Sequence, residues 1–164
     1  MDHLLNEVRS LFGAGAMPSA NALVNWDGFD QWDKEYAVKF YSGKTWKDVL
    51  AHNNKGGTAH KLEEWSVLCE PSLSYYGRAH LEYLFETADS VTPDDEFVSQ
   101  FFHQLYQLVY MHKGSPFTAS QTDLLVRIAK TLPLVAVERG VESLADDYVV
   151  HNIELYLEEL TRVS

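Results

Sequence analysis

The sequence predicts an all-α protein, a single compact domain over residues 1–164 in which seven to eight helices pack around a central apolar helix at about 93–112. Three observations lead to this fold class. Helix-capping residues stand at nearly every break in the apolar pattern, the runs between them have helical spacing, and none has the strict alternation of a strand. A chain of 164 residues can also bury roughly two-thirds of its unfolded surface, enough for a core without disulfides.

Capping residues mark where several helices begin. Thr45 precedes Asp48 by three residues, and Thr118 precedes Gln121 by the same interval, so each threonine hydroxyl can accept a bond from an unpaired backbone amide. We therefore expect helices at about 2–12, 30–41, 45–52, 59–68, 72–88, 93–112, 118–131 and 141–162, with 1–20 forming a peripheral N-terminal helix and loop.

The helix at 93–112 has the strongest start signal. Thr92 is a capping residue, Pro93 suits the first helical position, and Asp94, Asp95 and Glu96 follow at the positive end of the helix dipole. The run from 97 to 111, FVSQFFHQLYQLVYM, is apolar around more than half of its circumference. That pattern predicts a helix enclosed by others.

The helix at 72–88 divides into two faces at 100° per residue. Tyr76, Gly77 and His80 fall on the apolar face, where Gly77 indicates close approach of another helix and His80 is expected to be a hydrogen-bonded structural residue. The opposite face is expected to be exposed and to pair Arg78 with the acid four residues later. Its residues are Tyr75, Arg78, Glu82 and Glu86.

The last helix carries an acidic row. Asp147, His151, Glu154 and Glu158 recur at spacings of four, three and four, so they share one face, here called the acidic ridge. Three carboxylates and an imidazole are ligand types for a divalent ion, but a metal site needs converging ligands from elsewhere. We expect a solvated docking surface without metal or cofactor, with the opposite side buried through Val141, Leu144, Tyr148, Val149 and Tyr156.

Charge is unevenly distributed along the chain. The net charge is −11, of which residues 1–60 carry −1 (seven acids, six bases) and residues 61–164 carry −10 (seventeen acids, seven bases). Such a surface repels phosphate backbones and attracts basic partners, which argues against a nucleic-acid partner. No apolar run approaches the roughly 20 residues that span a bilayer, and the first apolar run is short and broken by glycine. We therefore expect no signal peptide, no membrane partner and a cytoplasmic location.

Three segments carry a family resemblance: FYSGKTWKDVL at 40–50, LEEWSVLCEPSLSYYGRAHLEYLFE at 62–86, and SPFTASQTDLLVRIAKTL at 115–132. In this order they resemble a family of small, uncharacterised bacterial all-helical domains that look like toxin-immunity proteins. The resemblance implies a helical fold and the cytosolic sequestration of a toxin, and it transfers no catalytic residue.

These observations favour a non-enzymatic protein-binding module, an immunity-type protein that neutralises a basic toxin domain, plausibly a nuclease, through its acidic surface. The alternatives are a small-molecule-binding or hydrolytic helical enzyme with a pocket at His80 or His103, and a helical regulatory adaptor. The residues expected to bind the partner are Tyr75, Arg78, Glu82, Glu86, Asp94, Asp95, Glu96, Asp147, His151, Glu154 and Glu158.

Overall fold

A computed structural model describes residues 1–24, 30–55 and 61–163 of the chain. These residues form α-helices, two short 3₁₀ helices and no strand, apart from one antiparallel bridge between Val24 and Leu68, which confirms the all-α fold class. The α-helices are α1 (Asp2–Leu11), α2 (Gln31–Tyr41), α3 (Trp46–Asn53), α4 (Leu62–Ser66), α5 (Ser72–Ala88), α6 (Asp95–His112), α7 (Ala119–Arg139) and α8 (Asp147–Val163). The 3₁₀ helices are η1 (Ala20–Ala22) and η2 (Glu142–Ala145).

The chain divides into two compact units. We call Leu5–Tyr83 the α1–α5 unit, and Met1–Leu4 together with Leu84–Ser164 the α6–α8 unit. Each unit buries apolar side chains. That all 164 residues form one domain stays a prediction.

The core of the α1–α5 unit is built around aromatic side chains of α2, α4 and α5. Trp65 is almost fully buried, and its indole nitrogen donates to the carbonyl of Leu73 at 2.9 Å. Tyr76 is buried as predicted, and its hydroxyl donates to the carbonyls of Tyr41 (3.1 Å) and Lys44 (2.8 Å). These bonds satisfy the polar tips of side chains whose rings are buried.

Gly77 allows other segments to approach α5 closely, as predicted. A Cβ placed on Gly77 would lie 3.3 Å from ring carbons of both Phe12 and Trp65. Both rings are nearly inaccessible to solvent, so they have little room to shift. The missing side chain therefore determines how closely the rings pack against the helix.

The segment at 20–24 is fixed to the start of α5 by hydrogen bonds. The carbonyl of Ala22 accepts from the Ser72 hydroxyl at 2.7 Å and from the Cys69 thiol at 3.4 Å. The backbone amide of Cys69 donates to the carbonyl of Leu23 at 3.0 Å. The carbonyls of this segment, which has no long helix of its own, thus accept hydrogen bonds from residues at and just before the start of α5.

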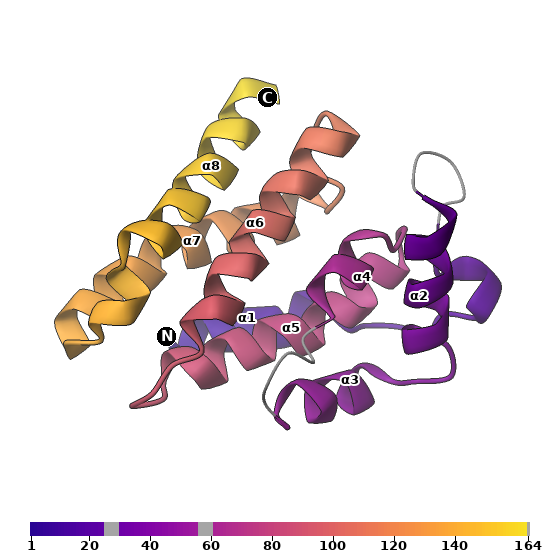
Figure 1. The fold of residues 1–164 in the computed structure, drawn as a ribbon, viewed down its shortest axis with the longest axis horizontal. Helices are drawn as coiled ribbons and strands as arrows, with labels where there is room; N and C mark the ends of the chain where they lie inside the picture. The colour runs from indigo at the N-terminus through magenta and orange to yellow at the C-terminus, as the bar shows by residue number, and fades with distance from the viewer. Residues whose placement is uncertain (25–29, 56–60, 164) are drawn as a thin grey trace. The chain divides into compact units, whose positions relative to one another are not determined.

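In the α6–α8 unit, α6 and α8 lie side by side (Figure 1) and pack against each other. The amide nitrogen of Asn152 in α8 donates to the Ser99 hydroxyl in α6 at 2.7 Å, and both side chains are buried. Phe101 and Phe102 are fully buried, in agreement with the predicted apolar character of α6.

The two capping boxes are confirmed, while three helix ends differ from the predictions. Asp94 rather than Thr92 caps α6, because its carboxylate accepts from the amide of Phe97 at 2.9 Å. Helix α7 continues past the predicted end at 131, through Pro133 to Arg139, and Gly140 then ends it at φ 69°. Burial of Ala136 favours this extension despite the hydrogen bond that proline removes.

The third difference concerns α8, which begins at Asp147 and not at 141. The preceding residues, from 142 to 145, form the separate 3₁₀ helix η2. The predicted start of the helix at 59–68 falls partly on residues 59 and 60, which lie outside the described residues.

Buried tyrosines make the protein sensitive to alkaline pH. Burial is the main cause that raises the pKa of Tyr41 and Tyr156, and burial followed by Tyr75 and Asp48 raises the pKa of Tyr76 to about 12. An unfolded tyrosine ionises near pH 10. The tyrosines of the native state therefore hold more protons than those of the unfolded chain above that pH. Their contribution to the free energy of unfolding should be constant below pH 10 and fall as pH rises toward 12.

This decrease in the free energy of unfolding at alkaline pH can be measured by chemical denaturation between pH 8 and about 12, with phenolate absorbance near 295 nm as the second readout. Tyr76→Phe should flatten the decline, whereas Tyr148→Phe, at an exposed position, should leave it unchanged. Equal slopes for the Tyr76 variant and the parent protein would contradict the role assigned to burial of Tyr76.

Candidate protein-binding surface

The outward face predicted for α5 is largely covered. Tyr75 and Glu82 are each only 7% exposed, Arg78 is half-buried, and Glu86 is exposed. The predicted exposure is therefore wrong for Tyr75 and Glu82. Tyr75 instead packs its ring edge-on against Tyr76, with 4.9 Å between ring centroids.

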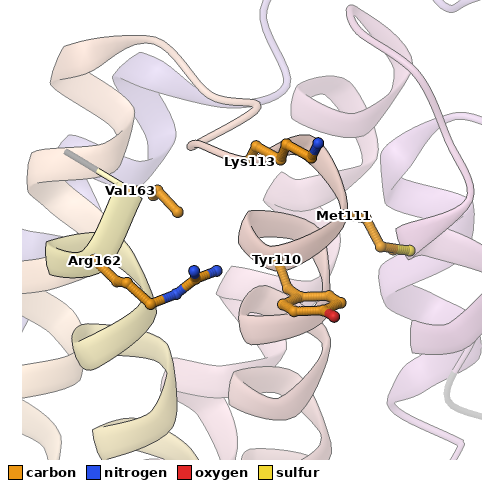
Figure 2. A pocket seen from close by; sticks show the side chains of 5 residues that line it. All are labelled: Tyr110, Met111, Lys113, Arg162 and Val163. Carbon is orange, nitrogen blue, oxygen red and sulfur yellow. The ribbon is translucent and has the colours of Figure 1, made fainter.

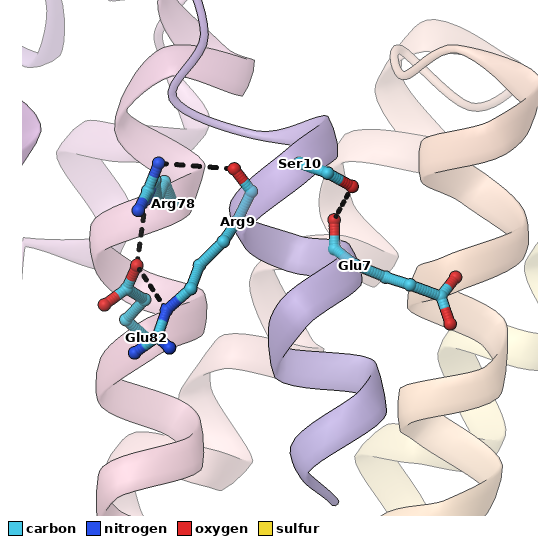
Figure 3. A network of polar contacts seen from close by, with 5 residues as sticks. All are labelled: Glu7, Arg9, Ser10, Arg78 and Glu82. Carbon is cyan, nitrogen blue, oxygen red and sulfur yellow. Dashed lines mark hydrogen bonds and ion pairs between the residues drawn. The ribbon is translucent and has the colours of Figure 1, made fainter.

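Glu82 is covered because two arginines neutralise it (Figure 3). Its Oε1 accepts from Nε of Arg78 at 2.8 Å, the predicted pair four residues apart, and lies 3.4 Å from Nε of Arg9 in α1. Arg78 also donates to the carbonyl of Arg9 at 3.3 Å, and its guanidinium lies 3.9 Å from the centroid of the Trp46 ring. A carboxylate held in this way has its charge compensated within the fold and is not available to a partner.

Gly13 provides the space for this network. It has φ 73°, in the left-handed region, and a Cβ there would lie 2.4 Å from Cδ of Arg78. A glycine at this position both ends α1 and leaves room for the Arg78 side chain.

The acids at the start of α6 differ in their roles. Asp95 and Glu96 are exposed, as predicted. Asp94 is half-buried and serves as the helix cap, and its own amide donates to the hydroxyl of Thr87. Asp94 is therefore occupied within the fold, which leaves Asp95 and Glu96 accessible.

The acidic ridge is present on α8 as predicted. Asp147, His151, Glu154 and Glu158 are all exposed, and no ion pair to any of them occurs in the described part of the chain. The opposite side of the helix is buried through Val149, Asn152, Ile153, Tyr156 and Leu160. The ridge is thus an uncompensated row of three carboxylates along one helix.

Tyr148 was predicted to be buried, but it is 59% exposed. The prediction extended the helical pattern from Val141 through Leu144, whereas α8 begins only at Asp147. Without the preceding turns, Tyr148 lies at the first turn of α8 beside the acidic ridge. The sequence signal for this exposure was Asp146, whose carboxylate caps the helix by accepting from the amide of Tyr148 at 2.8 Å.

The negative charge is concentrated in one unit. The residues of the α6–α8 unit include fourteen acids and five bases, a net charge of −9, whereas those of the α1–α5 unit include ten acids and eight bases, a net charge of −2. Three of the five bases pair with acids in the same unit: Arg127 with Asp123, Arg139 with Asp89, and Arg162 with Glu159. Glu86, Asp95, Glu96 and the acidic ridge all belong to this unit.

The two histidines considered for catalysis have structural surroundings. His80 is inaccessible to solvent, with Nε2 2.9 Å from the Tyr41 hydroxyl and Nδ1 3.2 Å from the amide nitrogen of Asn53, which confirms the predicted hydrogen-bonded core histidine. His103 is half-buried, and its ring packs near that of Tyr106.

Two open hollows occur at the end of α8. One is lined by Tyr110, Met111, Lys113, Arg162 and Val163 (Figure 2), and the other by Leu157, Glu158, Thr161 and Arg162. Neither hollow includes a histidine, and the guanidinium of Arg162 is already bonded to Glu159, at 2.9 Å through Nε. These hollows do not match the pocket expected for the enzyme alternative.

Within residues 1–24, 30–55 and 61–163, no group of three or more histidine, cysteine or acidic side chains converges to hold a metal ion. The same residues include no helix with the length and apolar character required to cross a bilayer.

No protein-family model matches the chain, and no curated protein or solved structure matches it either.

Proposed function

We propose that the protein is a cytoplasmic, non-enzymatic binding module that neutralises a basic partner protein through the acidic ridge of α8. The observation that carries the proposal is the exposed row of Asp147, Glu154 and Glu158, which form no ion pair with any residue that the structure describes and belong to a unit of net charge −9. Carboxylates without internal partners remain available for cations of another molecule.

The location of the ridge suits this role. It lies along a helix whose other side is held by α6, so the carboxylates are presented on a supported element. Tyr148 adds an exposed aromatic ring beside Asp147, and aromatic residues contribute much of the affinity in protein interfaces. The acids then govern the association rate and the choice of a basic partner.

The resemblance to small bacterial domains that look like toxin-immunity proteins supports a more specific partner. A toxin that acts on nucleic acid needs a positively charged surface to bind phosphates. An acidic row can occupy such a surface and exclude the substrate. The proposed partner is therefore a basic toxin domain of the nuclease type, and the proposed mechanism is steric and electrostatic occlusion without chemistry.

Reversal of the ridge charges is expected to abolish partner binding. The variant Asp147→Lys, Glu154→Lys, Glu158→Lys should lose at least about 100-fold in affinity, since each reversed charge both removes an attraction and adds a repulsion. Affinity capture from the native cell with the parent protein identifies its basic partner, and titration calorimetry with that partner measures the loss.

The matched control is Asp33→Lys, Glu35→Lys, Glu63→Lys, which makes the same change of net charge at exposed positions in the α1–α5 unit. This control should retain most of the affinity. Equal losses in the two variants would show that only net charge matters, and retention by the ridge variant would place the interface elsewhere.

A further inference from the structure

A second charged surface, of opposite sign, lies in the α1–α5 unit. Residues 34–61 contain six of the chain's thirteen basic residues and only two acids, Glu35 and Asp48, a local net charge of +4. Within the described part of this stretch, several lysines lie over aromatic rings near the end of α2 and the start of α3. We call Lys39, Phe40, Lys44, Trp46, Lys47 and Lys61 the basic-aromatic face.

Aromatic rings lie close to three of the cations of this face. The ammonium of Lys44 lies 3.7 Å from the centroid of the Phe40 ring, and that of Lys61 lies 5.9 Å from it. Lys47 lies 5.6 Å from the centroid of the Trp46 ring. Cation–π contacts of this kind restrict flexible side chains while leaving the charge available to an anion.

Basic residues outnumber acids in the stretch that forms this face, by six to two over residues 34–61. The pKa of Lys44 is lowered, mainly because the side chain is partly buried. The nearby charge of Asp48 raises this pKa, and that of Lys61 lowers it further. Lys61 pairs with Glu64 at 2.8 Å, and the carboxylate of Asp48 caps α3 through Thr45. Lys39 and Lys47 are exposed. An incoming carboxylate would therefore relieve repulsion among the lysines.

Exposed aromatic residues extend the face along α2. Trp32 and Tyr36 are 68% and 54% exposed, and at helical spacing they precede Phe40 by eight and four residues. Large exposed rings beside fixed cations have the composition of an interface for an acidic protein surface.

A matching surface occurs on this chain. The acidic ridge has three carboxylates on one exposed helix face, none of them in an ion pair within the described residues, with the exposed ring of Tyr148 beside them. From these two surfaces we infer that the basic-aromatic face binds the acidic ridge of a second copy of the chain, so that copies associate head to tail. The contact is heterologous, because different surfaces of the two copies meet.

The net charge of −11 makes this association depend on salt in a distinctive way. Repulsion between whole copies acts over long distances and is largely screened at about 0.15 M salt, whereas close pairs are screened less. Association should therefore be strongest at intermediate ionic strength, weaker at about 0.01 M and lost near roughly 1 M. We expect the dissociation constant for self-association to lie below roughly 1 mM, so that monomers and oligomers are both present at lower protein concentrations.

Sedimentation equilibrium with charge-swapped variants tests the pairing. The face variant is Lys39→Glu, Lys44→Glu, Lys47→Glu, and the ridge variant is Asp147→Lys, Glu154→Lys, Glu158→Lys. Each variant alone should remain at the monomer mass, because its two surfaces now have the same sign. An equimolar mixture should associate, because each variant supplies the surface that the other needs.

The matched control for the face variant is Lys113→Glu, Arg127→Glu, Lys130→Glu, which gives the same net charge from the α6–α8 unit and should leave self-association within about twofold of the parent value. Far-ultraviolet circular dichroism checks folding, and the single variants Lys39→Glu and Glu154→Lys replace any triple variant that unfolds. Their mixture should restore association in the same way.

A parent protein that stays monomeric up to roughly 1 mM at every salt concentration would overturn the inference. So would a mixture of folded swapped variants that fails to associate. The inference does not depend on the proposed function: a monomeric parent protein leaves binding of a basic partner unaffected. If both are correct, the basic partner displaces the second copy, because both occupy the acidic ridge.

Discussion

Replacement of Trp65 by alanine is expected to cost about 4 kcal/mol in the free energy of unfolding, the largest loss among the substitutions considered. The side chain is 1% exposed, its ring packs near His80 with 5.3 Å between ring centroids, and it fills the space next to Gly77. The substitution leaves a large cavity and also removes the hydrogen bond that the indole nitrogen donates to the carbonyl of Leu73.

Urea denaturation followed by circular dichroism measures this loss. The matched control is Trp32→Ala, the same chemical change at a side chain that is 68% exposed, which should alter stability by about 0.5 kcal/mol or less. Similar values for the two variants would contradict the assignment of Trp65 to the core of the α1–α5 unit.

Substitution of Arg78 by alanine is expected to cost about 2 kcal/mol. The change removes the principal partner of Glu82, whose side chain is 9% exposed, and leaves that carboxylate with the longer contact to Arg9 alone. It also removes the hydrogen bond to the carbonyl of Arg9 and the contact with the Trp46 ring. Partial exposure of Arg78 keeps the cost below that of a fully buried pair.

The control is Arg127→Ala, which breaks an arginine–carboxylate pair of the same i,i+4 spacing on an exposed surface, with Nε 3.0 Å from Asp123. That change should cost about 0.5 kcal/mol or less. Thermal or urea unfolding of the two variants in parallel gives the comparison. A loss for Arg78→Ala no greater than that for Arg127→Ala would mean that burial adds nothing to the network.

The local features of the fold could be predicted from the sequence because they depend on residues close together in the chain. The capping boxes at Thr45 and Thr118 need only a hydroxyl and a polar side chain three residues later. The pair of Arg78 and Glu82 needs only one helical turn. The acidic ridge likewise follows from the helical period alone, once α8 exists.

The features that failed depend on residues far apart in the chain. The helical wheel assigned Glu82 to solvent because it lies opposite the apolar face of the helix, but Arg9, 73 residues earlier, helps to neutralise it. Tyr75 is covered because α5 is buried around most of its circumference. Helical period alone does not distinguish such a helix from one with an exposed face.

Charge counts along the sequence also concealed the basic-aromatic face. The first 60 residues have a net charge of −1, because acids elsewhere in that region offset the five lysines between Lys34 and Lys55. The contacts of Lys44 with Phe40 and of Arg78 with Trp46 become visible only in three dimensions. The acidic surface, by contrast, could be predicted from the net charge of −10 over residues 61–164 and from the helical period.

The anchoring of Cys69 makes it a kinetic reporter for local opening. It is the chain's single cysteine, its thiol donates to the carbonyl of Ala22, and burial is the main cause that raises the pKa of that thiol. A protonated, partly covered thiol reacts slowly with disulfide reagents. The rate of its modification, relative to a free thiol, thus measures how often the segment at 20–24 detaches from α5 while the rest of the chain stays folded.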